Sequence, residues 1–205
     1  MGGRTRGPGI RHDVRRREIA DAVLEIVAEH GLASVSLSAV AARAGVSPGR
    51  VQHYFPAKDG LIAAAFDRGN ALSSARISAL VGSDPGSAAP RDVLSAVLTE
   101  LIPHDPATRA HMRVRQAFAA FALSDEAIAA RLRTEYARLH RRLADLLRRD
   151  QDAGRAPASL EPDTAAVGLT ALAEGLAYYV LIGVGSCDAA REQVRAAVDA
   201  AYRSR

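Results

Sequence analysis

The stretch 37–58, LSAVAARAGVSPGRVQHYFPAK, constrains the fold more than any other part of the chain. It predicts two short helices joined by a tight turn. Ala41 and Gly45 stand four residues apart, so the second helix can approach closely and the glycine can take the left-handed conformation that ends the first. Ser47 then offers an N-cap hydroxyl, and Pro48 occupies the first helical position, where its missing N–H costs nothing.

The second helix of this stretch has one apolar side and one outward side. Its apolar residues follow helical spacing together with those of the first helix: Val40, Ala41, Ala44, Val46, Val51, Tyr54 and Phe55. The outward residues are Gly49, Arg50, Gln52 and His53. An arginine pairs with guanine and a glutamine with adenine in the major groove, and bare backbone at a glycine approaches phosphate closely. The pattern therefore predicts a DNA-recognition helix.

Two further residues are placed to meet the DNA backbone. Lys58, the only lysine of the chain, opens the next helix, where it fits a phosphate contact; the alternative is a composition biased towards arginine. Ser36 is an expected N-cap whose neighbouring N–H groups also suit a phosphate. The predicted DNA-binding set is Ser36, Arg43, Ser47, Pro48, Gly49, Arg50, Gln52, His53, Tyr54 and Lys58.

Residues 15–66 resemble the DNA-binding domain of the TetR (tetracycline-repressor-like) family. The matching segments are a leading helix that ends at His30-Gly31, then residues 36–41, 44–49 and 53–61. The resemblance implies an all-helical, homodimeric transcription regulator, usually a repressor that a small molecule releases from DNA. Gln52 stands where the family commonly carries an aromatic residue, and the run 51–55, VQHYF, is similar to a subgroup akin to the choline/betaine-pathway repressors.

The composition limits the remaining classes. With 205 residues, 48% hydrophobic, the chain is long enough for a sizeable core, and its few aromatics favour helix over strand. A single cysteine excludes an internal disulfide framework and suits a reducing cytoplasm, and the N-terminus shows no apolar signal region. The first seventeen residues carry six arginines and one aspartate, which indicates either an arm that reaches DNA or a solubilising tail.

Periodicity and turn residues predict an all-helical fold in three parts. These are a flexible basic arm (1–13), a helix-turn-helix domain (14–60) and a ligand-binding and dimerisation domain (61–205). Helices are expected over residues 14–30, 58–81, 90–102, 107–123, 126–150 and 188–202, with a loop at 82–87. The arginines of 126–150 are expected on a solvated face, interleaved with Glu135, Asp145 and Asp150.

Residues 164–187 contain one charged residue, Glu174, and have the length of a membrane span. A mid-span carboxylate and many small residues instead favour a buried interface helix. The last helix carries its own apolar stripe, formed by Ala190, Val194, Ala197, Val198 and Ala201. We therefore expect a homodimer through the last two helices, without a membrane, which holds two recognition helices over a palindromic double-stranded operator.

The second domain is expected to bind a small-molecule effector of unknown identity, which shifts the helix from residue 58 and moves the recognition helices. Candidate pocket residues are Phe66, Met112, Arg115, Phe118, Phe121, Tyr136, Glu174 and Tyr178. Glu174 needs a partner, either Arg115 or Arg113 within the chain or a cationic ligand, and the internal ion pair is favoured. No catalytic constellation, metal motif or cofactor motif is found. A ligand-blind architectural protein would not need so large an apolar second domain.

Overall fold

The computed structural model describes residues 8–81 and 88–203, and throughout these ranges the regular structure is helical. The helices are α1 (Pro8–His30), α2 (Leu37–Arg43), α3 (Pro48–Tyr54), α4 (Lys58–Val81), α5 (Pro90–Glu100), α6 (Pro106–Ala122), α7 (Glu126–Asp152), α8 (Pro162–Leu181) and α9 (Cys187–Ala201). A short 3-10 turn, Leu32–Ser34, joins α1 to α2. The predicted all-helical class is confirmed.

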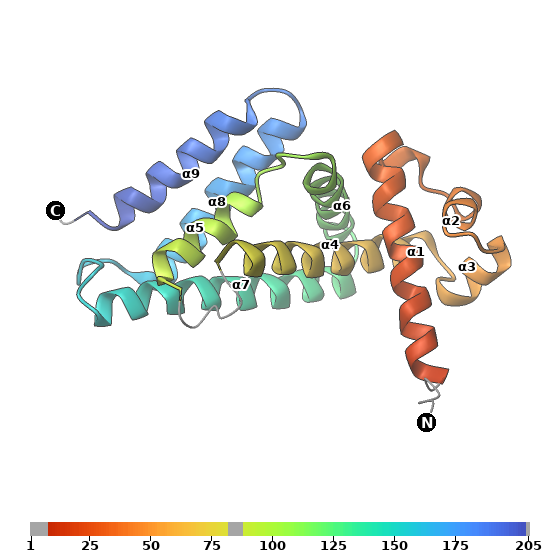
Figure 1. Cartoon of the computed structure of the whole chain (residues 1–205), viewed down its shortest axis with the longest axis horizontal. Helices are drawn as coiled ribbons and strands as arrows, with labels where there is room; N and C mark the ends of the chain where they lie inside the picture. Colours follow the sequence, from red (N-terminus) through yellow and green to blue (C-terminus); the bar gives the residue numbers. More distant parts are fainter. Residues whose placement is uncertain (1–7, 82–87, 204–205) are drawn as a thin grey trace, which may run out of the picture.

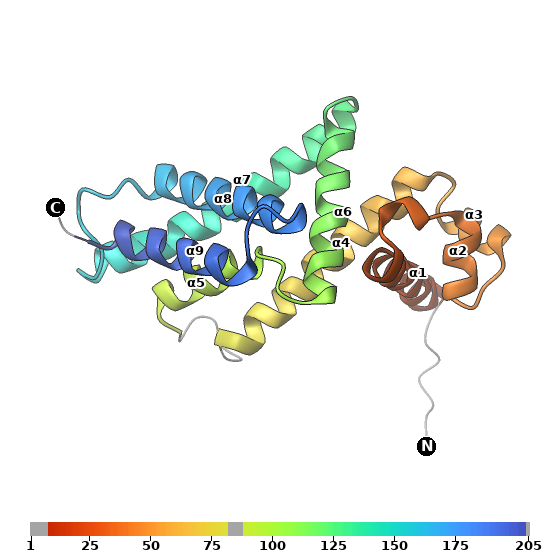
Figure 2. The same cartoon turned by 90° about the horizontal axis from the view of Figure 1, so that it is seen from above.

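The molecule has a small head and a larger body (Figures 1 and 2). Helices α1–α3 form the head at one end, and α5, α7, α8 and α9 form most of the body at the other. Helix α4 runs from the head into the body, and α6 packs against both α1 and α4 where the two parts meet (Figure 2). Helices α4 and α6 therefore connect the body to the head.

Two apolar clusters form the core. The head cluster takes its large buried residues from α1–α4, α6 and α7, and they include Ile19, Val23, Val27, Val40, Val51, Phe55, Leu61, Ile62, Phe66, Val114, Phe118 and Leu132. The body cluster includes Ile77, Leu94, Leu98, Ile102, Leu143, Leu147, Val194 and Val198. Helix α4 contributes to both, since Phe66 belongs to the first and Ile77 to the second. The head cluster thus extends past residue 60, the predicted domain boundary.

Two predictions, the start of the first helix and the exposure of Asp150, need correction. Residues 8–13, expected in a flexible arm, form the first turns of α1, consistent with a proline at the first helical position. The rest of that arm (1–7) and the predicted loop 82–87 lie outside the described residues. Asp150, expected on a solvated face, is 1% exposed because Arg155 Nε and the Tyr202 hydroxyl each donate to it at 2.7 Å.

Helices α8 and α9 differ in how they use their apolar residues. Ala190, Val194 and Val198 of α9 are buried against α5 and α8 of the same chain, so this stripe is core rather than interface. Within the described ranges, α8 is long and apolar enough to cross a membrane, and 33% of its most apolar window is buried in the chain. Its outward side keeps large residues exposed, namely Val167, Leu172, Tyr178 and Tyr179, and Ile182 follows at its end.

Candidate DNA-binding face and effector cavity

The turn between α2 and α3 has the expected local geometry. The Ser36 hydroxyl accepts the backbone N–H of Ala39 at 3.2 Å, and that of Ser47 accepts the N–H of Arg50 at 3.3 Å. Gly45 has φ of +63°, a conformation that other residues adopt at a cost. Two helices with capped starts and a left-handed glycine between them form the predicted helix-turn-helix.

The inner side of α3 is fixed to the head. Val51 is fully buried and Phe55 is 2% exposed. Arg16 of α1 donates from Nη1 to the Tyr54 carbonyl at 3.0 Å, and its guanidinium lies 4.4 Å from the Phe55 ring centroid. This arginine therefore satisfies a carbonyl at the C-terminal end of α3 and anchors the helix. Sequence reasoning had grouped it only with the general basic charge.

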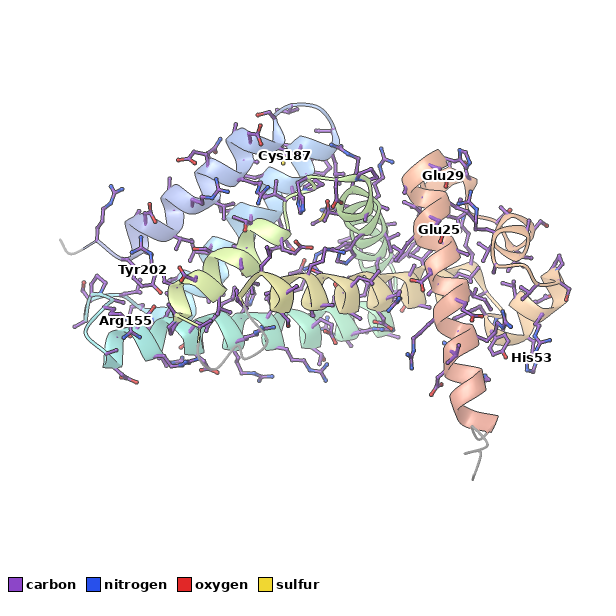
Figure 3. All side chains as sticks on the ribbon, in the orientation of Figure 1. Glu25, Glu29, His53, Arg155, Cys187 and Tyr202 are labelled. Carbon is purple, nitrogen blue, oxygen red and sulfur yellow. The ribbon has the colours of Figure 1, made fainter. Side chains whose placement is uncertain are left out.

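The outer side of α3 is free to meet a partner. Gly49, Arg50, Gln52 and His53 are exposed, and Figure 3 shows His53 at the outer edge of the head, away from the body. Lys58 is exposed at the first position of α4. Ser36, Ser47 and Pro48 are also exposed, so each of these predicted residues is accessible to a partner. The Tyr54 ring is half-buried, with centroid distances of 4.7 Å to His12 and 5.5 Å to His53.

Arg43, predicted to contact DNA, has its guanidinium bound to carboxylates within the head. Its guanidinium donates to Glu25 at 3.3 Å and forms a two-point contact with Glu29, and both carboxylates belong to α1. The hydrogen bond to Arg43 lowers the pKa of Glu29, and the bonds to Glu29 and Glu25 raise that of Arg43. Arg43 therefore ties α2 to α1, and its charge is already compensated.

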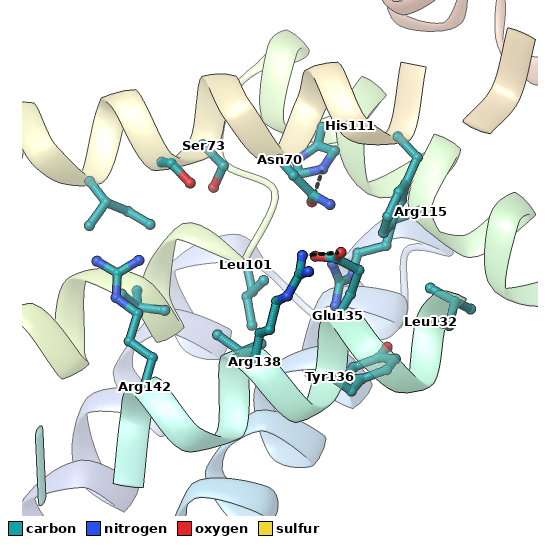
Figure 4. Close-up of a pocket in the computed structure, with 15 residues that line it drawn as sticks. Asn70, Ser73, Leu101, His111, Arg115, Leu132, Glu135, Tyr136, Arg138 and Arg142 are labelled. Carbon is teal, nitrogen blue, oxygen red and sulfur yellow. Dashed lines mark hydrogen bonds and ion pairs between the residues drawn. The ribbon is translucent and has the colours of Figure 1, made fainter. Parts of the chain in front are cut away.

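A cavity of about 210 Å³ opens between α4, α6 and α7, with Val97 of α5 at its wall (Figure 4). Of the predicted pocket residues it contains Phe66, Arg115 and Tyr136. The other lining residues are Asn70, Ser73, Ser74, Ile77, Val97, Leu101, His111, Leu132, Glu135, Arg138, Leu139 and Arg142. Sequence reasoning missed the polar members, although Asn70, Ser73 and Ser74 interrupt the apolar pattern of α4 and signalled a polar wall.

Five predicted pocket residues do not line this cavity. Phe118 stacks on Phe66 at 4.6 Å inside the head cluster, and Phe121 packs against the same cluster. Met112 is buried in the body cluster, and Tyr178 is 46% exposed on the outside of α8. Glu174 does not line the cavity itself but contacts two side chains that do, Arg115 and Tyr136. Helical periodicity placed these residues on apolar faces without showing which neighbour each face meets.

Glu174 is held by an internal ion pair. Arg115 donates to its Oε1 from Nε at 2.9 Å and from Nη2 at 2.5 Å, and the Tyr136 hydroxyl donates to Oε2 at 2.7 Å. Burial raises the pKa of Tyr136 to about 12, with Glu174 adding to the rise, so the phenol keeps its proton. The predicted internal ion pair of Glu174 is therefore confirmed, with Arg115 as its partner. Arg113 instead donates to the Val27 carbonyl at 3.3 Å.

His111 separates the cavity from a second one, of about 410 Å³, between α1, α4 and the start of α6. It lines both, and its ring lies on the bare backbone of Gly69, where an added Cβ would stand 2.1 Å from Cδ2. Nε2 lies 3.1 Å from Asn70 Oδ1. Burial lowers the pKa of His111 to about 3, with help from Arg115 and Arg76, so the ring is neutral at pH 7.

Among residues 8–81 and 88–203, no group of three histidine, cysteine or acidic side chains is arranged to hold a metal ion. An exposed recognition helix on an anchored helix-turn-helix, joined by α4 to a hollow helical body, defines a DNA-binding transcriptional regulator.

Residues 19–65 match the family described as bacterial regulatory proteins, tetR family, and residues 90–203 match the BetI-type transcriptional repressor C-terminal domain. The chain belongs to the TetR family of transcriptional regulators.

Individual relatives agree with this assignment. The regulator BetI of Escherichia coli is 31% identical over 164 residues, 80% of each chain. A TetR-family regulator from Rhodococcus sp. has a structure with a TM-score of 0.79 and 30% identity, over 93% of this chain and all of that one. A regulator from Saccharomonospora viridis, solved in complex with choline, shares the fold with a TM-score of 0.79 and 24% identity, over 94% of this chain and all of the other.

Proposed function

We propose that this protein is a cytoplasmic, homodimeric repressor without enzymatic activity, which leaves a palindromic operator when a small molecule occupies the α4–α7 cavity. The observation that carries the DNA part is the outer side of α3. Arg50 and Gln52 are exposed there, while Val51 and Phe55 on the opposite side are buried. A helix fixed on one side and polar on the other can enter the major groove without rearrangement.

The exposed side of α8 supports the dimer. Val167, Leu172, Tyr178 and Tyr179 lie on one side of this helix, and small Gly175 between them meets no other side chain within the described chain. Covering these residues with the same face of a second copy removes apolar surface from water. Two heads are then held on one assembly, as a two-half-site operator requires.

The cavity supports a ligand-controlled release. It lies between α4 and α7, and α4 continues from its wall to Lys58 at the edge of the DNA-binding face. A ligand with different affinity for two positions of α4 would shift the balance between DNA-bound and free dimer. The choline complex of the S. viridis regulator shows that this fold accommodates a small molecule.

Selection of bound genomic fragments, followed by titration of the recovered operator, tests the DNA part. Lys58→Ala should weaken binding to all sequences alike and reduce its salt dependence, because lysine meets phosphate. Arg50→Ala or Gln52→Ala should cost about 1–3 kcal/mol and change which bases are preferred. Arg133→Ala, an exposed arginine of α7, is the matched control and should change neither. Uniform loss across operator variants for Arg50→Ala would contradict base readout.

Sedimentation of a charged α8 variant tests the dimer. Gly175→Glu places a carboxylate in the centre of the proposed interface, and an added Cβ at this position has no neighbour within 4 Å, so we expect folded monomers. Ala137→Glu, on an exposed position of α7, should stay dimeric. A Gly175→Glu protein that sediments as a dimer at low micromolar concentration would refute the α8 interface.

A further inference from the structure

The charges around the α4–α7 cavity are not balanced. Four charged side chains line it: Arg115, Glu135, Arg138 and Arg142. Arg138 donates to Glu135 at 3.0 Å, and Arg115 is bound to Glu174 directly behind the wall. Arg142 forms no ion pair with any described residue. The lining therefore has one uncompensated positive charge and no carboxylate that lacks a partner.

The two acidic groups near the cavity are poor sites for a cation. Glu174 accepts hydrogen bonds from Arg115 and from Tyr136, and its side chain is only 21% exposed, so an ammonium ligand would have to displace both donors. Glu135 already faces the guanidinium of Arg138. A quaternary ammonium would also approach Arg142 and meet like charge.

The polar groups of the opposite wall are suited to an anion. Figure 4 shows Arg138 and Arg142 reaching from α7 towards α4, where Ser73 and Asn70 lie. The serine hydroxyl is a donor, and Asn70, whose Oδ1 is turned to His111, offers its NH₂ group. Because His111 is neutral, it adds no second charge. A guanidinium without an ion-pair partner, together with neutral hydroxyl and amide donors in the same lining, offers the kind of groups that bind carboxylate.

The rest of the lining is apolar and small. Phe66, Ile77, Val97, Leu101, Leu132 and Leu139 form most of the remaining wall. The volume of about 210 Å³ exceeds the roughly 150 Å³ of an engineered apolar cavity that binds benzene, so it suits a ligand of about ten non-hydrogen atoms. We propose that the cavity binds a small amphipathic carboxylate, with its head at Arg142 and its chain against these apolar residues, rather than a quaternary ammonium compound.

This inference rests on the proposed effector role of the cavity, but calorimetry on the full-length protein without DNA tests it separately. Octanoate, octylamine, octanol and choline are titrated at neutral pH and low salt. We expect octanoate to bind at least tenfold more tightly than octylamine, octanol or choline. Arg142→Gln should weaken octanoate about tenfold and leave octanol unchanged, because only the acid uses the guanidinium. Arg133→Gln, the same change elsewhere on α7, should have no effect.

Several results overturn the carboxylate assignment. They are tighter binding of octylamine or choline, equal binding of octanoate and octanol, no binding of octanoate, or an unchanged octanoate affinity in Arg142→Gln. Thermal melting of both arginine variants checks that they are folded. If octanoate binds as expected but fragment selection recovers no specific DNA, the repressor proposal fails while the ligand class stands. If an operator is recovered but octylamine binds more tightly than octanoate, the carboxylate assignment fails while the repressor proposal stands.

Discussion

The contact between Gly69 and His111 predicts a substitution whose effect changes sign with its background. An alanine Cβ at position 69 would lie 2.1 Å from His111 Cδ2 and 2.7 Å from Cγ and Nε2, well inside contact distance. The ring is 7% exposed and tied to Asn70, so it cannot swing into solvent while keeping its hydrogen bond. We expect Gly69→Ala to destabilise the protein even though alanine is the better helix former.

The expected loss of stability in Gly69→Ala is the balance of two costs and one gain. Overpacking of a buried contact costs about 1–3 kcal/mol, and loss of the hydrogen bond between His111 and Asn70 costs about 1 kcal/mol. Replacing glycine inside a helix returns about 0.5–1 kcal/mol. The net loss is about 2 kcal/mol, which lowers the melting temperature by about 4–8 °C for a chain of this size.

The assay is a double-mutant cycle with His111→Ala, followed by chemical unfolding at fixed protein concentration. His111→Ala removes the three atoms nearest to an added Cβ at position 69, so in this background Gly69→Ala should stabilise the protein by about 0.5–1 kcal/mol through the helix alone. The coupling between the two positions is then about 3 kcal/mol. If Gly69→Ala stabilises both backgrounds equally, the close approach of α4 and α6 at this point is refuted.

Two further perturbations test the buried polar groups. The folded pKa of His111 is about 3, below its ordinary value of about 6.5, so on acidification the unfolded chain takes up a proton that the folded ring does not. The stability due to this group is therefore present above pH 6.5 and should fall by about 2 kcal/mol by pH 5. Urea titrations should show this loss for the unmodified protein and not for His111→Gln. Glu174→Ala leaves the buried Arg115 without its carboxylate partner and should lower the free energy of unfolding by about 3 kcal/mol. Glu174→Leu combined with Arg115→Met removes both charges and should recover most of that stability. A double variant as unstable as Glu174→Ala would exclude the unpaired charge as the cause.

The local signals of the head allowed its structure to be predicted. Ser36, Gly45, Ser47 and Pro48 act within a few residues of their own positions, and the structure places each in the role that the pattern predicts. Arg43 shows the limit of such reasoning. Its fate depends on Glu25 and Glu29, which lie 18 and 14 residues earlier on another helix, and no local rule decides between them and a phosphate.

The cavity was harder to predict because its walls come from four helices. Periodicity identified Phe66, Arg115 and Tyr136, but it selected large aromatic residues and passed over Asn70 and Arg142. These two polar side chains line one cavity only because α4 packs opposite α7 in the folded chain, which local sequence patterns do not show. The pairing of Glu174 could be predicted, because a lone carboxylate in an apolar segment needs a partner and Arg115 was one of the two arginines proposed for it.

The sharing of α6 and α7 side chains with the head has a consequence for recombination between related genes. Val114, Phe118 and Leu132 belong to the same apolar cluster as the helix-turn-helix, although they lie at least fifty residues beyond it in the sequence. A chimera that joins a foreign head at residue 60 would set these three side chains against surfaces shaped for other neighbours. New operator specificity is therefore reached more easily by changing the outward residues of α3 one at a time than by exchanging the whole unit.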